Sequence, residues 1–367
     1  MSRGWSSCSE ERVPPPEKTL TEFIIGEQRR FPAATGGFTA LLNDIRLACK
    51  RIAYLVGKGA LAADADLAGT ANQIFLRTNE WGEHLAGIVS TAIEQPYRIP
   101  AEHPRGRYLL ACHPLDGSGG LDANVPAGSI FSVLACPDDF AGDEERAFLQ
   151  RGARQVCAGY AIYGPLTMLV LTFGRGVHGF TLDREIGEFI HTHPDLHIAE
   201  ETSEFAINTS NARFWEPAVK RYVDECLAGR SGPRGKDFNM RWIASLVAEA
   251  HRILMRGGVF LYPRDERLQV RAGRVRLLSE ANPIGMVIEQ AGGMASTARG
   301  RILDVEPQEL HQRVPLILGS KNEVARIERY HGEYDRGEDK PFVSPLFNER
   351  PYDAPLFGTR GLFRVEA

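Results

Sequence analysis

The segment RYLLACHPLDGSGGLD, residues 107–122, joins a short apolar strand to a glycine-rich turn. Residues 107–112 have the composition of a buried strand, and this strand leads directly into the turn. Residues 117–120 of the turn can present consecutive backbone amides, which form a concavity suited to phosphate oxygens. Because functional residues concentrate where loops leave a rigid scaffold, this turn is the first candidate site in the chain.

Two carboxylates flank the turn, at Asp116 and Asp122. Magnesium prefers a few carboxylates together with the phosphate oxygens of its substrate. An ion held here would polarise a phosphate and lower the pKa of an attacking water molecule. A short Asp-Gly-Ser-Gly turn taken alone is more often an ordinary loop, so the local chemistry leaves both interpretations open.

Composition narrows the classes of protein to which the chain can belong. It has 367 residues, of which 43% are hydrophobic, and a formal net charge of −4. This predicts a large core in two packed halves and argues against nucleic-acid partners. The six cysteines form no Cys-x-x-Cys pair, which indicates reduced thiols in a cytoplasmic compartment.

Neither end of the chain nor its longest apolar run predicts a membrane segment. Residues 1–18 lack the apolar stretch of a signal peptide and are expected to form a flexible leader. The apolar run over residues 157–173 is interrupted by Gly159, Gly164 and Pro165, so it is too short for a membrane helix. We therefore interpret it as buried strands.

Hydrophobic periodicity predicts a mixed chain of helices and strands. An amphipathic helix is expected from Thr39 to about Gly57 and a less regular one over residues 73–86. Strands are predicted at residues 107–112, 129–135, 160–173, 177–183 and 188–192. Further helices are predicted at residues 216–228, 242–255 and 283–290.

The pattern breaks near residue 200, so we expect two halves over residues 19–199 and 200–335. The charged, proline-rich chain from Tyr330 is expected to be an exposed arm, with an extended tail over residues 336–367.

Two other motifs have simpler interpretations than their patterns suggest. Residues 174–179 read G-x-G-x-x-G, but the following residues alternate like a strand instead of opening a helix, which favours a hairpin turn over a dinucleotide-binding loop. His191, His193 and His197 have metal-ligand spacing, but nothing nearby completes a ligand set, so we expect an exposed connector.

Several long segments carry a more specific signal than any short motif. They are LLACHPLDGSGGLDANVPAGSIFSV (109–133), YGPLTMLVL (163–171), GVHGFTLDREIGEF (176–189), FAINTSN (205–211), NMRWIASLVAEAHRILMRGGVFLYP (239–263), RLLSEANPIGMVIEQAGGMAS (276–296) and ILDVEPQELHQRVPLILGS (302–320). Together these segments resemble the class I fructose-1,6-bisphosphatase family of bacterial type, over nearly the whole chain from about Thr19.

The resemblance implies an α/β architecture with a layered α-β-α-β-α sugar-phosphatase fold. The implied reaction is the hydrolysis of fructose 1,6-bisphosphate to fructose 6-phosphate and phosphate with magnesium. It also implies a cytoplasmic homotetramer in carbohydrate metabolism of the gluconeogenesis or Calvin-cycle type. The N-terminal half would then hold the metal and phosphate motif, and the C-terminal half would bind the sugar.

The resemblance also assigns roles to residues. Asp116 and Glu280 would be catalytic carboxylates that bind the metal ion, with Leu115 adding its main-chain carbonyl and His113 standing at a ligand position. The implied substrate-binding residues are Asp116, Gly117, Ser118, Gly119, Asn208, Tyr262, Arg274 and, reaching a neighbouring subunit's site, Arg241.

The chain departs from the family pattern mainly on the metal side. His113 replaces an aspartate, Thr91 and Ala92 replace paired glutamates, Gly119 and Gly120 replace serine and asparagine, and a segment containing a Lys-Leu-Asp run is missing after Asn72. A neutral nitrogen ligand suits manganese or zinc better than magnesium. The alternative to an active enzyme is therefore a catalytically impaired paralogue that binds sugar phosphates or associates with an active subunit.

Overall fold

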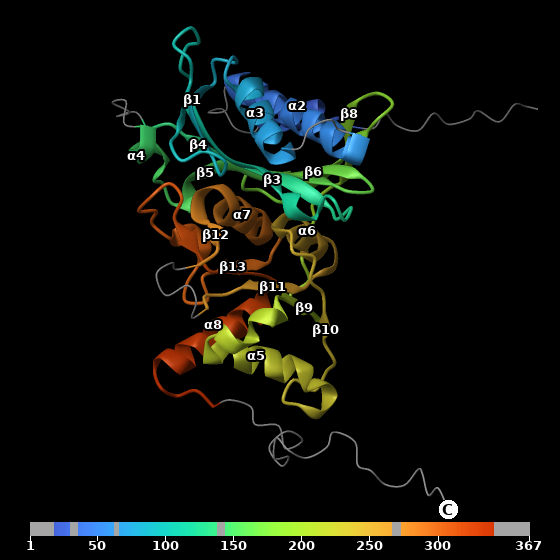
Figure 1. Cartoon of the computed structure of the whole chain (residues 1–367), viewed down its shortest axis with the longest axis vertical. Coiled ribbons are helices and arrows are strands. Elements are labelled where there is room, and N and C mark those ends of the chain that lie inside the picture. The colour runs from blue at the N-terminus through green and yellow to red at the C-terminus, as the bar shows by residue number, and fades with distance from the viewer. Residues whose placement is uncertain (1–17, 30–35, 62–65, 138–143, 266–272, 341–367) are drawn as a thin grey trace, which may run out of the picture.

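Helix and sheet layers alternate along the long axis of the molecule (Figure 1). The structure is a computed structural model that describes residues 18–29, 36–61, 66–137, 144–265 and 273–340. In order, the layers are α2 (Gly36–Lys58) with α3 (Leu67–Asn79), an eight-stranded sheet, α6 (Leu246–Arg256) with α7 (Asn282–Gln290), a five-stranded sheet, and α5 (Pro217–Leu227) with α8 (Lys321–Asp335). The expected α-β-α-β-α architecture is confirmed.

The eight-stranded sheet has the strand order β2-β1-β3-β4-β5-β6-β7-β8. Its strands are β1 (Leu85–Ser90), β2 (Tyr97–Arg98), β3 (Tyr108–Asp116), β4 (Ala127–Ala135), β5 (Gln155–Tyr163), β6 (Thr167–Thr172), β7 (His178–Asp183) and β8 (Glu188–His193). Only β1 and β3 pair in parallel; all other pairs are antiparallel. The predicted strands are confirmed, with the apolar run of residues 157–173 divided between β5 and β6.

The five-stranded sheet has the order β10-β9-β11-β15-β13. Its strands are β9 (Glu204–Ile207), β10 (Asn239–Met240), β11 (Val259–Tyr262), β13 (Met294–Ser296) and β15 (Leu316–Gly319). A separate ribbon pairs β12 (Val275–Arg276) with β14 (Arg313–Val314). These strands were not predicted, because they are short and lie between segments whose helical periodicity is stronger.

The outer helices are explained by their apolar faces. Helix α2 places Leu41, Ile45, Ala48 and Ile52 at helical spacing, and all four are fully or almost fully buried against the eight-stranded sheet. The prediction of a helix from Thr39 is confirmed, although the helix begins at Gly36. Two shorter helices lie near the eight-stranded sheet. Helix α1 (Leu20–Gln28) contacts the edge strand β8, and α4 (Glu144–Phe148) lies toward the other edge of this sheet (Figure 1).

The second predicted helix, over residues 73–86, is wrong at its C-terminal end. Helix α3 stops at Asn79, and Glu83 has a positive φ of 59° in the turn that follows. Residues 85–90 then form β1, in which every residue is buried. A strand buried on both faces has no alternation, so periodicity alone cannot separate it from a buried helix.

The expected exposed arm from Tyr330 is wrong at its start, because residues 330–335 are the end of helix α8, whereas residues 336–340 follow the helix and are mostly exposed. Tyr330 is 2% exposed in α8 and donates a hydrogen bond to Glu225 Oε2 at 2.5 Å. Its ring also lies under the guanidinium of Arg221, 3.8 Å from the ring centroid. The charges of this segment thus belong to an amphipathic helix against α5. Residues 341–367 lie outside the described part of the chain.

The two weaker motifs differ in outcome. Gly174 and Gly176 have positive φ values in the turn between β6 and β7, so the hairpin interpretation of residues 174–179 is confirmed. The exposed connector is wrong for His191 and His193, which lie in β8, and the ring of His191 packs against those of Phe23 and Phe180. Packing against aromatic rings explains this histidine without a metal.

Two observations concern the cysteines and the helices of the described residues. Cys49, Cys112, Cys136, Cys157 and Cys226 are free thiols, and Cys8 lies outside the described residues. Of the helices in the described ranges, none combines the length and apolarity needed to cross a membrane.

Candidate active site

Asp116 ends strand β3 and is buried. Its Oδ2 accepts hydrogen bonds from the Ser245 hydroxyl at 2.7 Å and from the Val247 backbone amide at 2.9 Å. Ser245 is the N-cap residue of α6, so the carboxylate also faces the positive end of that helix. Both hydrogen bonds go to the same oxygen, which leaves Oδ1 available to a metal ion.

Glu280 lies in a π-helical turn, Leu277–Ala281, that joins β12 to α7. Its Oε2 accepts a hydrogen bond from the Arg276 backbone N–H at 2.6 Å, and its Oε1 lies 2.7 Å from Nδ1 of His113. π-Helical turns are rare and occur often at functional sites. This turn brings Glu280 to the end of β3, although it is 167 residues from His113 in the sequence.

His113, Asp116 and Glu280 form a single group whose ligand atoms all lie within 4.8 Å of one another. Elsewhere in the described ranges, no three His, Cys, Asp or Glu side chains come together in this way. Two carboxylates and one imidazole in a largely enclosed position suit a divalent ion, so the residues present fit a metal. Leu115, the expected carbonyl ligand, lies between two of them in β3.

The three side chains shift one another's pKa. Burial disfavours the charged form of His113, but its hydrogen bond to Glu280 and the charge of that carboxylate outweigh burial and raise the histidine pKa. Burial likewise opposes ionisation of Glu280, yet His113 lowers the pKa of the glutamate. Burial raises the pKa of Asp116 against the opposing effects of His113, Val247 and Ser245. His113 and Glu280 thus each favour the charged form of the other.

The loop after β1 lies beside this group but supplies no carboxylate to it. Arg276 Nη1 donates to the Thr91 carbonyl at 2.6 Å, and His311 Nε2 lies 3.0 Å from the Glu94 carbonyl oxygen. Thr91 and Ala92 have no carboxylate, and Glu94 is exposed. The loop thus lacks the glutamates that the resemblance implied, and the charge of the Arg276 guanidinium, which the loop binds, acts on both His113 and Glu280.

The glycine-rich turn keeps a backbone conformation that favours glycine at one position. Gly117 has a φ of 75°, and a Cβ there would lie 3.0 Å from the Cβ of Ser245. The amides of Gly120 and Leu121 close the turn on the carbonyls of residues 117 and 118. The amides of residues 117–119 are thus the candidates for binding a phosphate next to the metal-ligand group.

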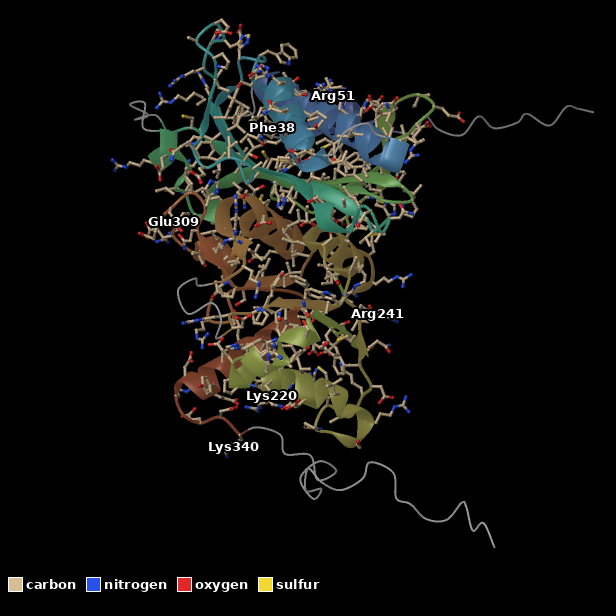
Figure 2. The ribbon with its side chains drawn as sticks, in the orientation of Figure 1. Phe38, Arg51, Lys220, Arg241, Glu309 and Lys340 are labelled. Carbon is tan, nitrogen blue, oxygen red and sulfur yellow. The ribbon has the colours of Figure 1, made fainter. Side chains whose placement is uncertain are left out.

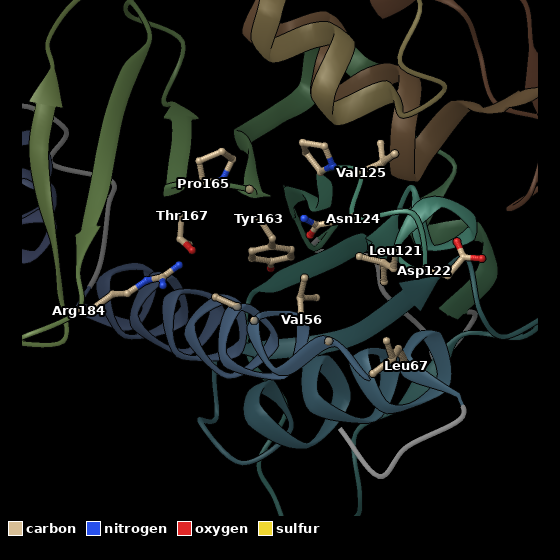
Figure 3. Close-up of a pocket in the computed structure, with 15 residues that line it drawn as sticks. Val56, Leu67, Leu121, Asp122, Asn124, Val125, Tyr163, Pro165, Thr167 and Arg184 are labelled. Carbon is tan, nitrogen blue, oxygen red and sulfur yellow. The ribbon is translucent and has the colours of Figure 1, made fainter. Parts of the chain in front are cut away.

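Asp122 does not join that group. It is exposed, and its Oδ1 accepts a hydrogen bond from the Ala123 amide at 2.9 Å. Asp122 instead lines a cavity of about 840 Å³ between α2, the glycine-rich turn and the β5–β6 hairpin (Figure 3). Of the two aspartates that flank the turn in the sequence, only Asp116 lies at the candidate site.

Three predicted sugar-side residues lie around one pocket. Asn208 follows β9, Tyr262 ends β11 and Arg274 precedes β12, and all three line the pocket together with Trp215 and Asp265. Because β9 and β11 are parallel neighbours, their carboxyl ends meet at the same edge of the sheet.

Arg241 does not line this pocket. It lies at the edge of the molecule near β10 (Figure 2), half exposed, with its Nε 3.4 Å from Glu204 Oε1. No partner subunit is needed to explain its ion pair.

Sequence reasoning missed the residues that orient the site. Ser245 was detectable, because a serine before a helical apolar pattern is a typical N-cap. Arg276, His311 and Asp265 had no comparable signal, since their contacts depend on the β12–β14 ribbon and on bridges between distant segments.

The fold and this site define a class of protein: a layered α/β fold of the sugar-phosphatase type with a candidate metal-ligand group beside a glycine-rich turn. Comparison with known sequences makes the assignment specific. Residues 18–194 match the model of the fructose-1,6-bisphosphatase N-terminal domain, and residues 198–332 match that of the C-terminal domain. The chain belongs to the class 1 fructose-1,6-bisphosphatase family.

Individual relatives support this membership along nearly the full length. A class 1 fructose-1,6-bisphosphatase of Methylibium petroleiphilum is 55% identical over 361 residues, which covers 95% of this chain and 98% of that protein. One from Hydrogenophilus thermoluteolus is 56% identical over 363 residues, with the same two coverages. The Leishmania major fructose-1,6-bisphosphatase in holo form is 36% identical, with a TM-score of 0.80 over 87% of this chain and 100% of that one.

Proposed function

We propose that this protein hydrolyses fructose 1,6-bisphosphate to fructose 6-phosphate and phosphate. The observation that supports this most directly is the metal-ligand group of His113, Asp116 and Glu280 beside the turn of residues 117–120. The named activity of its full-length relatives points in the same direction.

In the proposed reaction, different residues would bind the metal ion, bind the phosphate and balance its charge. A divalent ion bound by His113, Asp116 and Glu280 would polarise the phosphate and lower the pKa of the attacking water. The amides of residues 117–119 would bind the oxygens of the reacting phosphate. The Arg276 guanidinium would balance part of the negative charge that gathers there.

The chemistry of the ligands favours manganese over magnesium. Magnesium binds mainly to carboxylates and water, whereas an imidazole ligand suits softer divalent ions. The site offers two carboxylates and one imidazole. We therefore infer that the protein uses Mn²⁺ more effectively than Mg²⁺.

A specific observation favours a second candidate, a catalytically impaired paralogue that binds sugar phosphates. Within the described ranges the site has one three-residue ligand group, and Thr91 and Ala92 supply no carboxylate to it. Residues 71–73 lie inside the continuous helix α3, so an additional acidic segment does not interrupt the chain there. No described side chain next to the group stands out as the general base.

Further expectations follow from family membership. We infer that residues 19–199 form the metal and phosphate half and residues 200–335 the sugar half. We also infer that the protein is a cytoplasmic homotetramer in which Arg241 reaches the sugar pocket of a neighbouring subunit. Its reaction would belong to gluconeogenesis or to a Calvin-type cycle.

The decisive experiment measures phosphate release from fructose 1,6-bisphosphate with Mg²⁺ and, separately, with Mn²⁺. Turnover that is higher with Mn²⁺ and lost in Asp116→Asn would support the phosphatase. Asp122→Asn is the matched control, because Asp122 flanks the same turn outside the ligand group. Absence of turnover with both ions, together with thermal stabilisation by fructose 6-phosphate, would replace the phosphatase with the binding paralogue.

A further inference from the structure

Asp265 is a buried acid in the sugar pocket. It is 3% exposed, although it lies only three residues after the end of β11. Its backbone forms an antiparallel bridge with Trp215, and its Oδ2 accepts a hydrogen bond from Arg274 Nη2 at 3.2 Å. A carboxylate in this environment needs charged or hydrogen-bonding partners, because burial of an unpaired charge is costly.

Arg274 is held at two points and remains partly accessible. Besides the contact with Asp265, its carbonyl accepts a hydrogen bond from Arg313 on the facing strand β14. The Arg274 side chain is 33% exposed, and its guanidinium carbon lies 6.0 Å from the ring centroid of Tyr262. The guanidinium is thus fixed at one nitrogen while other parts of it can reach a ligand.

An arginine can serve two anions at once. Its planar fork presents five N–H donors, so one edge can bind a carboxylate while another binds a phosphate. A lysine ammonium acts as a compact point charge without this geometry. The pair of Asp265 and Arg274 is therefore suited to present a guanidinium edge in a fixed orientation beside Asn208 and Tyr262.

We propose that Asp265 is a positioning residue that orients Arg274 to bind the phosphate distant from the metal-ligand group. This inference rests on the proposed function, since it takes the pocket to be the site of the sugar phosphate. Asp265 does not bind the ligand itself; it acts through Arg274.

Two opposing effects must be separated in a test. The Asp265 carboxylate orients Arg274, which strengthens phosphate binding, but its negative charge repels the phosphate. When Arg274 is absent, only the repulsion remains. A purely structural Asp265 would change stability and leave the coupling with Arg274 in ligand binding at zero.

The experiment is a double-mutant cycle on the binding of fructose 6-phosphate, measured by titration calorimetry with the full-length protein. The variants are Asp265→Asn, Arg274→Ala and the double substitution. We expect Asp265→Asn alone to weaken binding at least fivefold. In the Arg274→Ala background the same change should leave binding unchanged or slightly tighter. Asp335→Asn, which removes the exposed partner of Arg299 on α8, is the matched acid-to-amide control.

The possible outcomes separate this inference from the proposed function. If the unmodified protein binds fructose 6-phosphate and Asp265→Asn has the same effect in both backgrounds, the positioning role is wrong and the phosphatase is unaffected. If the unmodified protein does not bind fructose 6-phosphate, both fail. Circular dichroism and the melting temperature identify a variant that fails to fold, and Arg274→Lys then tests the same geometry. Binding by that variant that equals the unmodified protein would also overturn the proposal.

Discussion

At the scale of single residues, the proposed preference for Mn²⁺ over Mg²⁺ rests on His113. We expect His113→Asp to increase Mg²⁺ affinity by about tenfold or more, because it replaces a neutral nitrogen ligand with a hard anionic one. Titration calorimetry with Mg²⁺ and with Mn²⁺ measures the change in preference. His197→Asp is the control, since His197 is exposed and remote from the ligand group. Equal Mg²⁺ affinity before and after the substitution at position 113 would show that this side chain is not a ligand.

The glycines of the turn offer a matched pair of substitutions. Gly117→Ala should lower the free energy of unfolding by about 1–3 kcal/mol and weaken phosphate binding, because it combines a positive φ with a close approach to Ser245. Gly119→Ala should change little, since a Cβ there meets nothing within 4 Å. Denaturant unfolding and phosphate titration of both variants check this. Equal losses in the two variants would contradict the strain argument.

Asp44, on the buried face of α2, makes stability depend on pH. Burial raises its pKa to about 6, above the ordinary value of 3.8. The native state therefore keeps a proton that the unfolded state loses, so the protein loses stability as pH rises from about 4 to about 6. Asp44→Asn should remove this loss and stabilise the protein at pH 8 by about 1–3 kcal/mol.

The measurement is the free energy of unfolding of both proteins at pH 4 and pH 8. The advantage of the asparagine variant should be small at pH 4 and full at pH 8. An advantage of the same size at both pH values would mean that the carboxylate does not titrate as described.

At the scale of elements, the N-terminus of helix α6 both caps the helix and orients the Asp116 carboxylate. Ser245→Ala should cost about 1 kcal/mol of stability through loss of the N-cap and should also weaken metal binding, because it removes a hydrogen bond to Asp116. The control is Asp66→Ala, which removes the N-cap of α3. The Asp66 side chain accepts a hydrogen bond from the Gly69 amide at 2.9 Å. That variant should lose similar stability with unchanged metal affinity, as urea unfolding and calorimetry can measure.

The elements also show what a sequence can reveal. Helix α2 was predictable because its apolar face repeats at helical spacing, and β3 because an apolar run leads into a glycine-rich turn. Strand β1 was missed because it is buried on both faces: its first two residues were assigned to the end of a helix and the rest to no element. The turn that aims Glu280 is a π-helix, whose hydrogen bonds differ from those of an α-helix without a sequence signature. Its role came only from the family resemblance.

At the scale of the whole molecule, the metal ion would bridge segments from both halves of the chain. Mn²⁺ at 100 times its dissociation constant should add about 2.7 kcal/mol to the free energy of unfolding, provided that the unfolded chain does not bind it. A chelator should reverse the gain, and Glu280→Gln should abolish most of it. Thermal unfolding with and without Mn²⁺ measures the effect. A gain that survives in Glu280→Gln would locate the ion elsewhere.

The site also has a consequence for the order of events on the ribosome. Asp116 and Glu280 are separated by about 160 residues of chain, which take on the order of 10 to 30 s to synthesise at roughly 5–20 residues per second. Through that interval the emerging polypeptide carries the glycine-rich turn without one of the proposed metal-binding carboxylates. A truncated product that stops before residue 280 would lack this carboxylate, so we expect it to release no phosphate from the proposed substrate.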